Sequence, residues 1–245
     1  MKMNLTQKMT LSAILCALSI AIKSINFSFT YFDTTLYDIP IIISSVTMGP
    51  VVGLIVGVIS DVTSMFFPPY YPFVPGYTIS AALVGFIPGF VLYLMNRKVL
   101  NNKVAQIVCY VLFGLVGPGG AYFAYTYDID LALWIRIVLM VLSFVVSACL
   151  IILTIYLAKK RKDQNSSFYK ITLIVTIIEL ICYIGLAPVI YVTSFGGIYG
   201  VLLFSRIIRA SFMIPFKGLI LYYLFRALIQ AKAIKDPFFI NETSK

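Results

Sequence analysis

The chain contains no histidine and only nine acidic residues among its 245. Histidine is the commonest metal ligand and the commonest general base in proteins, so its absence removes both options. The sequence also shows no acidic cluster able to hold a metal, and no serine or cysteine nucleophile with a recognisable base beside it. These absences argue against an enzyme, and we expect no metal and no cofactor.

Two further absences narrow the possible functions. The sequence has no Gly-x-x-x-x-Gly-Lys-Ser/Thr phosphate-binding loop, so the chain cannot itself hydrolyse ATP by that route. Its four cysteines each fall within an apolar segment and have no paired spacing. This pattern indicates neither a disulfide framework nor a metal site.

Apolar residues are what the sequence has in abundance. They make up 61% of the chain, whereas charged residues make up only 11%. Apolar runs of about 18 or more residues recur along the whole length, and such runs are typical of membrane-spanning helices. The 19 basic residues lie mostly in the short connections, which the positive-inside rule explains better than a nucleic-acid partner does. We therefore predict an all-α polytopic membrane protein.

The distribution of charge predicts about eight membrane segments, with the N- and C-termini in the cytoplasm. This count requires a break at Gly49-Pro50, which divides the apolar run 38–66 into two short helices. Both are too short to cross a bilayer upright, so at least one must be tilted or lie deep in the protein. With the break, the basic clusters of the connections all fall inside: 97–103, 159–162 and 232–235.

Three basic residues interrupt the last apolar segment. At 100° per residue, Arg209 lies about 60° and Lys217 about 20° around the helix from Arg206, so all three share one face. Placing a cation at mid-membrane costs about 2.5–3.5 kcal/mol. This cost indicates that these side chains face a cavity or contact a ligand. Two alternatives stay open: the side chains snorkel to the interface, or they pair internally with acids such as Asp61 or Glu179.

A proline-rich outer loop at 67–78 supplies flat aromatic faces that could stack on a planar ring. An aromatic belt at the membrane interface is the alternative interpretation. Asp61, which we place toward the outer end of the third helix, could accept hydrogen bonds from an amino-substituted ring, and arginines could pair with carboxylates. Together these features favour an anionic ligand with a flat heterocycle.

The first segment, at about 9–25, has a row of three small residues at four-residue spacing: Ala13, Ala17 and Ala21. Such a row lets another helix approach closely. It predicts either a docking surface for a partner subunit or ordinary internal packing.

Several short motifs, in this order, resemble the substrate-binding S components of energy-coupling factor (ECF) transporters, and the folate branch in particular. They are the alanine row, Gly49-Pro50, Ser60-Asp61, the Pro-Gly-Tyr-Thr-Ile-Ser run at 75–80, and Arg206-x-x-Arg209 followed by Ile214-Pro215. The resemblance covers about residues 8–96 and 168–230. It implies a single integral membrane domain, 1–245, with a six-helix core and an inserted two-helix hairpin at 103–163. At position 217 the resemblance leads us to expect an acidic or neutral polar residue, and a lysine is found there.

The resemblance also implies a function, partners and a location. The chain would capture a vitamin, folate by this resemblance, at the extracytoplasmic face of the cell membrane for uptake driven by ATP. Its partners would be a transmembrane coupling subunit, which docks on the alanine row, and two cytoplasmic ATPase subunits. The predicted substrate-binding residues are Arg206, Arg209, Asp61, Tyr71, Phe73, Tyr77 and Thr78.

Two other functions remain open at this stage. The vitamin could be another small molecule, such as pantothenate or riboflavin. Alternatively, the chain could be an autonomous secondary transporter in which Asp61 and Glu179 act as proton sites, and it would then need neither ATP nor partners.

Overall fold

A computed structural model describes residues 4–25, 28–29, 32–33, 36–67, 73–96, 165–196 and 199–230, together with isolated positions between 137 and 152. The chain divides into two compact units. The first comprises residues 1–99 and 223–245, and the second comprises residues 100–222. The predicted hairpin at 103–163 falls almost entirely outside the described residues.

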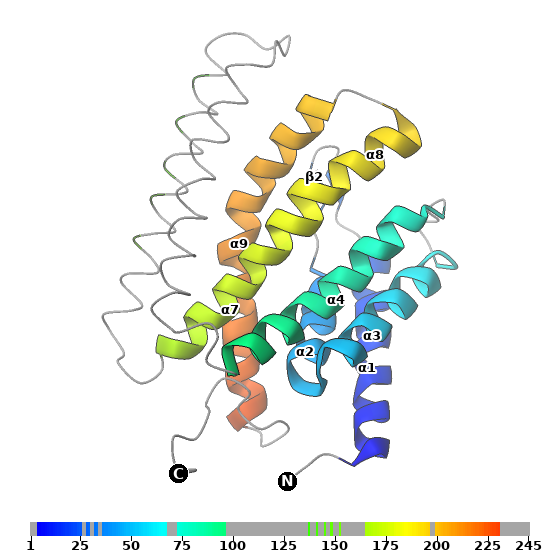
Figure 1. The fold of residues 1–245 in the computed structure, drawn as a ribbon, viewed down its shortest axis with the longest axis vertical. Coiled ribbons are helices and arrows are strands. Elements are labelled where there is room, and N and C mark those ends of the chain that lie inside the picture. Colours follow the sequence, from blue (N-terminus) through cyan, green and yellow to red (C-terminus); the bar gives the residue numbers. More distant parts are fainter. Residues whose placement is uncertain are drawn as a thin grey trace. The chain divides into compact units, whose positions relative to one another are not determined.

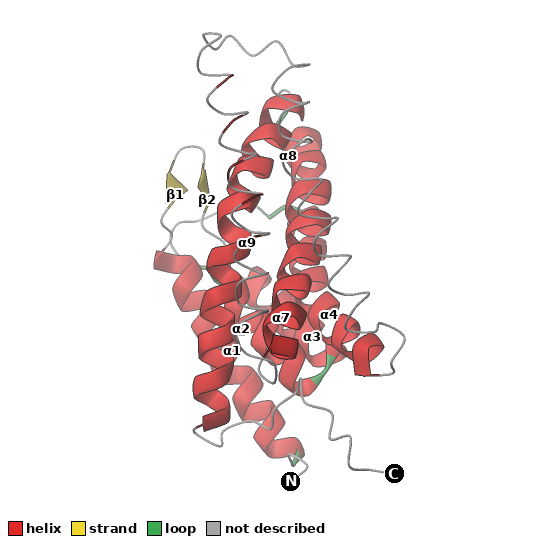
Figure 2. Ribbon diagram, turned by 90° about the vertical axis from the view of Figure 1, so that its left-hand side faces the viewer, coloured by secondary structure: helices red, strands yellow, loops and turns green. Residues whose placement is uncertain are grey.

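Four whole helices, one short hairpin and the end of a further helix at residues 223–230 form the described part of the first unit (Figure 1). The helices are α1 (Leu5–Ile25), α2 (Asp38–Met48), α3 (Pro50–Ser64) and α4 (Pro75–Asn96). Two antiparallel strands, β1 (Ser28–Phe29) and β2 (Phe32–Asp33), lie between α1 and α2 in the sequence (Figure 2). Helices α2, α3 and α4 pack against one another, and α1 packs on α2 and α3.

The break between α2 and α3 follows from the local sequence, as predicted. Gly49 has a φ of 106°, which residues with a side chain rarely adopt. Pro50 then opens α3 at a position where a missing backbone N–H costs nothing. The 11 residues of α2 span only about 16 Å, too short to cross a bilayer. All of them except Thr47 are buried, so α2 is the short helix that lies deep in the protein.

Glycines allow α3 and α4 to pack with their backbones in contact. A Cβ added at Gly85 would collide with the carbonyl oxygen of Gly53, and one added at Gly53 would collide with that of Gly85. One turn further along, a Cβ at Gly57 would collide with the carbonyl oxygen of Ala81. These small residues therefore let α3 and α4 approach closely.

This contact predicts that Gly85→Ala destabilises the protein by about 1–3 kcal/mol, because neither backbone can yield to the new methyl group without moving a helix. Gly218→Ala is the matched control, since its Cβ would find Thr172 Oγ1 at an ordinary 3.6 Å. We expect the control to leave the protein unchanged or slightly more stable. Thermal unfolding in detergent measures both, and equal midpoints for the two variants would contradict the prediction.

The described part of the second unit contains a long helical segment with a π-helical interruption. It runs through α7 (Asn165–Ile178), the π-helix η1 (Glu179–Leu186) and α8 (Ala187–Phe195). Helix α9 (Tyr199–Gln230) follows, and the division between the units falls within it, after Tyr222. The sequence gave no sign of the π-helix, because a π-helix depends on hydrogen bonding that composition does not reveal.

The fold class is confirmed as an all-α membrane protein. Four helices among the described residues are long and apolar enough to cross a membrane: Thr6–Ile25, Pro75–Met95, Lys170–Phe195 and Ser205–Gln230. The predicted end of the outer loop at 78 was wrong, because α4 begins at Pro75. Proline suits the first turn of a helix, so the last residues of the predicted loop belong to α4. The eight-segment count and the position of the termini stay predictions.

Candidate functional site

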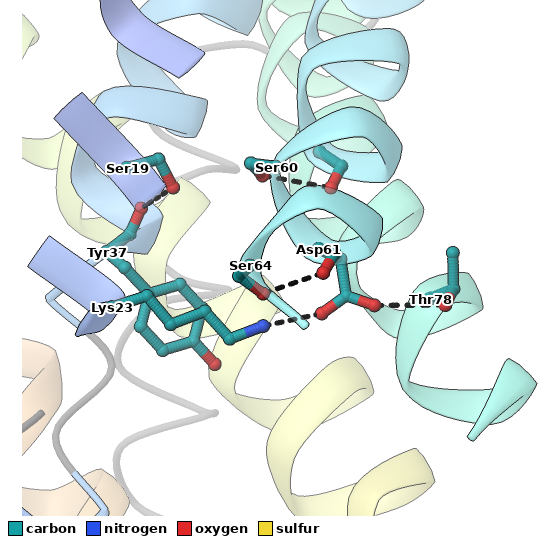
Figure 3. A network of polar contacts seen from close by, with 8 residues as sticks. Ser19, Lys23, Tyr37, Ser60, Asp61, Ser64 and Thr78 are labelled. Carbon is teal, nitrogen blue, oxygen red and sulfur yellow. Dashed lines mark hydrogen bonds and ion pairs between the residues drawn. The ribbon is translucent and has the colours of Figure 1, made fainter. Parts of the chain in front are cut away.

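In the first unit, Asp61 joins three helices through two contacts of its carboxylate (Figure 3). Lys23 Nζ from α1 lies 2.7 Å from Oδ1, and the Thr78 hydroxyl from α4 donates to Oδ2 at 2.9 Å. The side chain of Asp61 is 8% exposed and that of Lys23 is 20% exposed. The carboxylate is therefore held in a fixed orientation, and its cation partner lies nearer the surface.

The last turns of α1 place Lys23 at this carboxylate. Ser19, one turn earlier, is buried and donates a hydrogen bond to the backbone oxygen of Tyr37 at 2.9 Å. The Tyr37 ring lies under Lys23, with 5.4 Å between Nζ and the ring centroid (Figure 3). This contact adds a cation–π attraction to the ion pair.

Sequence reasoning did not identify Lys23 as part of the site. The available signal was Asp61 itself, because an acid inside an apolar helix requires a partner. The choice of partner among 19 basic residues depends on how α1 packs against α3, which the sequence pattern does not report.

In the second unit, one buried carboxylate receives two cations. Arg209 Nη2 lies 3.1 Å from Glu179 Oε2, and Lys217 Nζ lies 2.7 Å from Glu179 Oε1. All three side chains are at most 2% exposed. The ring of Tyr183, also in η1, lies 4.4 Å from Arg209 Cζ and 4.9 Å from Lys217 Nζ. We call Glu179, Arg209, Lys217 and Tyr183 the Glu179 cluster.

This cluster shows the internal pairing that the sequence left open as an alternative for Arg209 and Lys217. Eight residues separate the two cations on α9, about 12 Å along the helix axis, yet their long side chains reach one carboxylate. Arg206 is half-buried on the same helix. Ligand binding by Arg209 would therefore have to compete with Glu179, a condition the sequence alone did not impose.

The aromatic residues predicted to contact the ligand lie near the start of α4. Phe73 is 61% exposed, just before the helix, and Tyr77 is half-buried in its first turn. Tyr71 lies outside the described residues. Thr78, the remaining predicted contact, is the hydroxyl that orients Asp61.

The alanine row of α1 is exposed along its length. Ala13, Ala17 and Ala21 are all exposed, and two large apolar neighbours on the same face are also exposed: Ile14 at 59% and Leu18 at 48%. By contrast, Leu15 and Ser19 on the opposite face are buried. Ordinary packing within the first unit therefore does not explain the row.

Among the described residues, no group of histidine, cysteine, aspartate or glutamate side chains could hold a metal ion. The charged groups inside the apolar helices are instead paired with one another: Asp61 with Lys23 in one unit, and Arg209 with Glu179 in the other. Charged residues inside apolar helices are typical of proteins that move or bind solutes in the membrane.

The four long apolar helices define the class of this chain as a multi-pass membrane protein. A family model for the substrate-specific component of ECF transporters matches residues 7–130, just over half of the 245-residue chain. The chain therefore belongs to this family, which is a transport component rather than an enzyme. The matched region contains the Lys23–Asp61–Thr78 contacts and ends before the Glu179 cluster. No curated protein matches the chain.

Proposed function

We propose that this S component captures folate at the extracytoplasmic face of the cell membrane, for uptake driven by ATP hydrolysis in partner subunits. The observation that carries the proposal is the Asp61 carboxylate, which Thr78 holds in one orientation inside a membrane protein. A fixed carboxylate recognises the adjacent amino and ring N–H groups of a flat heterocycle such as the pterin of folate.

In this proposal the ligand replaces Lys23 rather than Thr78 at the carboxylate of Asp61. The lysine side chain is long and partly exposed, so an amino-substituted ring can replace Nζ at Oδ1 while Thr78 keeps Oδ2 in place. The exposed ring of Phe73 and the half-buried ring of Tyr77, beside Thr78 in the sequence, supply stacking surfaces.

Folate also carries two carboxylates, and the proposal assigns these to Arg206 and Arg209. Guanidinium pairs with carboxylate through two parallel hydrogen bonds, which makes arginine the usual partner of this group. Folate therefore combines the two chemistries that the intramembrane charges of this chain can recognise. Tyr71 remains part of the proposed site.

The exposed alanine row supports the proposed assembly. A stripe of methyl-sized side chains lets a helix of the coupling subunit pack closely on α1. The proposed complex contains this chain, one transmembrane coupling subunit and two cytoplasmic ATPase subunits.

Calorimetric titration of the purified protein with folate, riboflavin, thiamine, biotin and pantothenate tests the proposed ligand. We expect folate alone to bind tightly. Binding of a different vitamin would keep the transport role and replace the ligand. No binding of any would contradict the proposal and favour a transporter that acts without partners.

Arg206→Glu should weaken folate binding by about 2–5 kcal/mol, because charge reversal places a carboxylate against a carboxylate. Arg206 is the more suitable target of the two arginines for charge reversal, since it is half-buried whereas the side chain of Arg209 is only 2% exposed. Arg226→Glu, a half-buried position near the end of the same helix, is the matched control and should bind normally. Equal dissociation constants for both variants would remove Arg206 from the site.

A further inference from the structure

Helix α1 carries polar contacts on one face and the alanine row on another. Three polar side chains contact other parts of the first unit, and they lie within about 40° of one another around the helix. They are Ser12, Ser19 and Lys23, which contact Met48, Tyr37 and Asp61 in that order. The exposed alanine row begins about 100° from Ser12 and reaches the opposite side of the helix at Ala21. One helix therefore joins the Asp61 carboxylate to the proposed docking surface.

Of these three contacts, the Lys23–Asp61 ion pair is the one that the proposed ligand replaces. The Asp61 carboxylate also accepts the hydroxyl of Thr78, so it connects the last turn of α1 to the first turn of α4 (Figure 3). The two aromatic residues proposed to stack on the ligand, Phe73 and Tyr77, lie just before and within that first turn of α4. A ligand at Asp61 would therefore change how the last turn of α1 is attached to the unit.

Resting on the proposed function, we propose that Lys23 is a positioning residue that couples ligand capture to docking of the coupling subunit. Without ligand, the ion pair fixes the last turn of α1 against α3. With the ligand on Asp61, Lys23 is released, and the end of α1 that carries Ala21 adjusts to the docking helix. The empty S component therefore docks weakly, and the loaded one docks tightly.

The position of Ala21 makes the docking row sensitive to this ion pair. Ala21 lies two residues before Lys23, about 3 Å along the helix axis. Packing between small residues requires a close approach of two backbones, so a small shift at one end of the row changes the fit. Only 17% of the apolar stretch of α1 is buried, against 50% for that of α4. The loss of one inner contact therefore removes a larger share of the attachment of α1 than it would for α4.

The transport role gives the direction of the coupling. Hydrolysis of ATP by a complex that holds an empty S component would move no solute, so docking should favour the loaded component. By thermodynamic linkage, a ligand that tightens docking by a given factor must bind more tightly to the assembled complex by the same factor. Couplings of this kind are typically about 5–150-fold.

The affinity of the purified S component for the complex of coupling and ATPase subunits, measured with and without folate, tests the inference. We expect folate to tighten docking of the wild type by about tenfold. Lys23→Met lacks the ion pair, so its ligand-free affinity should already lie within about threefold of that of the loaded wild type, and folate should add less than about twofold. A merely structural role for Lys23 would weaken docking in both conditions and leave their ratio unchanged.

Lys8→Met is the matched control. It removes a lysine from the same helix, but Lys8 lies about 22 Å from Lys23 along the helix axis. We expect this variant to keep the tenfold response to folate. The ratio of the two affinities cancels any direct contact between Lys8 and the partner subunits.

Asp61→Asn removes the charge from the other side of the ion pair, and its measurement needs no vitamin. Its ligand-free docking should be about as tight as that of the loaded wild type. This second variant decides the matter if Lys23→Met does not fold, and ligand-free docking no tighter than that of the ligand-free wild type would then overturn the inference.

Equal responses to folate by the wild type and Lys23→Met would also overturn the inference, and so would folate-bound wild type that docks no more tightly than the ligand-free protein. Failure of the proposed ligand gives a different result. A wild type that does not bind folate would remove folate as the ligand, whereas tighter ligand-free docking by Asp61→Asn would still support control of docking by the ion pair.

Discussion

Replacing Glu179 with glutamine should destabilise the protein by at least about 3 kcal/mol, because it removes the carboxylate that both Arg209 and Lys217 contact. All three side chains are almost completely buried, so water cannot take over the role of the carboxylate. The amide keeps the shape of the side chain and accepts hydrogen bonds, but it carries no charge. The loss therefore reports charge neutralisation rather than packing.

Asp61→Asn is the matched comparison for this prediction. Asp61 also contacts a lysine, but that lysine is 20% exposed and can turn toward solvent. We expect a smaller destabilisation, on the order of 1 kcal/mol, as is typical of ion pairs that water reaches. Thermal unfolding of both variants in the same detergent measures the difference. Equal unfolding midpoints would contradict the view that burial determines how much each of these two acids contributes to the stability of the protein.

Replacing Ala17 with tryptophan should abolish assembly with the coupling and ATPase subunits and leave vitamin binding intact. Ala17 is exposed at the middle of the alanine row, so the larger ring meets no neighbour within the first unit. It would, however, hold a docking helix several ångströms away and remove the close contact that small residues permit. The expected result is a folded S component that no longer co-purifies with its partners.

Ile59→Trp is the control for the docking prediction. Ile59 is 50% exposed on α3, so this variant adds an aromatic ring to a different apolar face of the same unit. We expect it to assemble normally. Co-expression with the partner subunits from the same genome, followed by affinity purification, measures both variants. Normal assembly of Ala17→Trp would show that the coupling subunit docks elsewhere.

Several elements of the fold could be predicted because local chemistry decides them. The bounds of α2, Asp38–Met48, follow from an apolar run that ends at Gly49-Pro50, and a positive φ followed by proline stops one helix and starts the next. The start of α4 was misplaced for a related reason. Pro75 was assigned to the loop because of its fixed φ, although the same property suits the first turn of a helix.

The candidate site was predictable only in part. The energetic cost of charge in a membrane singled out Asp61, Arg209 and Lys217 as residues that need partners. It did not reveal that Lys23 forms an ion pair with Asp61, or that Glu179 pairs with both Arg209 and Lys217 of α9. These pairs join residues 30 to 38 positions apart in the chain, so they depend on the packing of whole helices.

The sequence by itself determined the membrane class, the break at Gly49 and the presence of charges that must be neutralised inside apolar helices. Each of these features depends on the chemistry of residues that are neighbours in the sequence, so it can be predicted without knowing how the helices pack. Only the tertiary structure decided which acid meets which cation, and which face of α1 stays exposed. Ion pairing acts over a few ångströms between side chains, and those distances are set once helices that are distant in sequence have packed together.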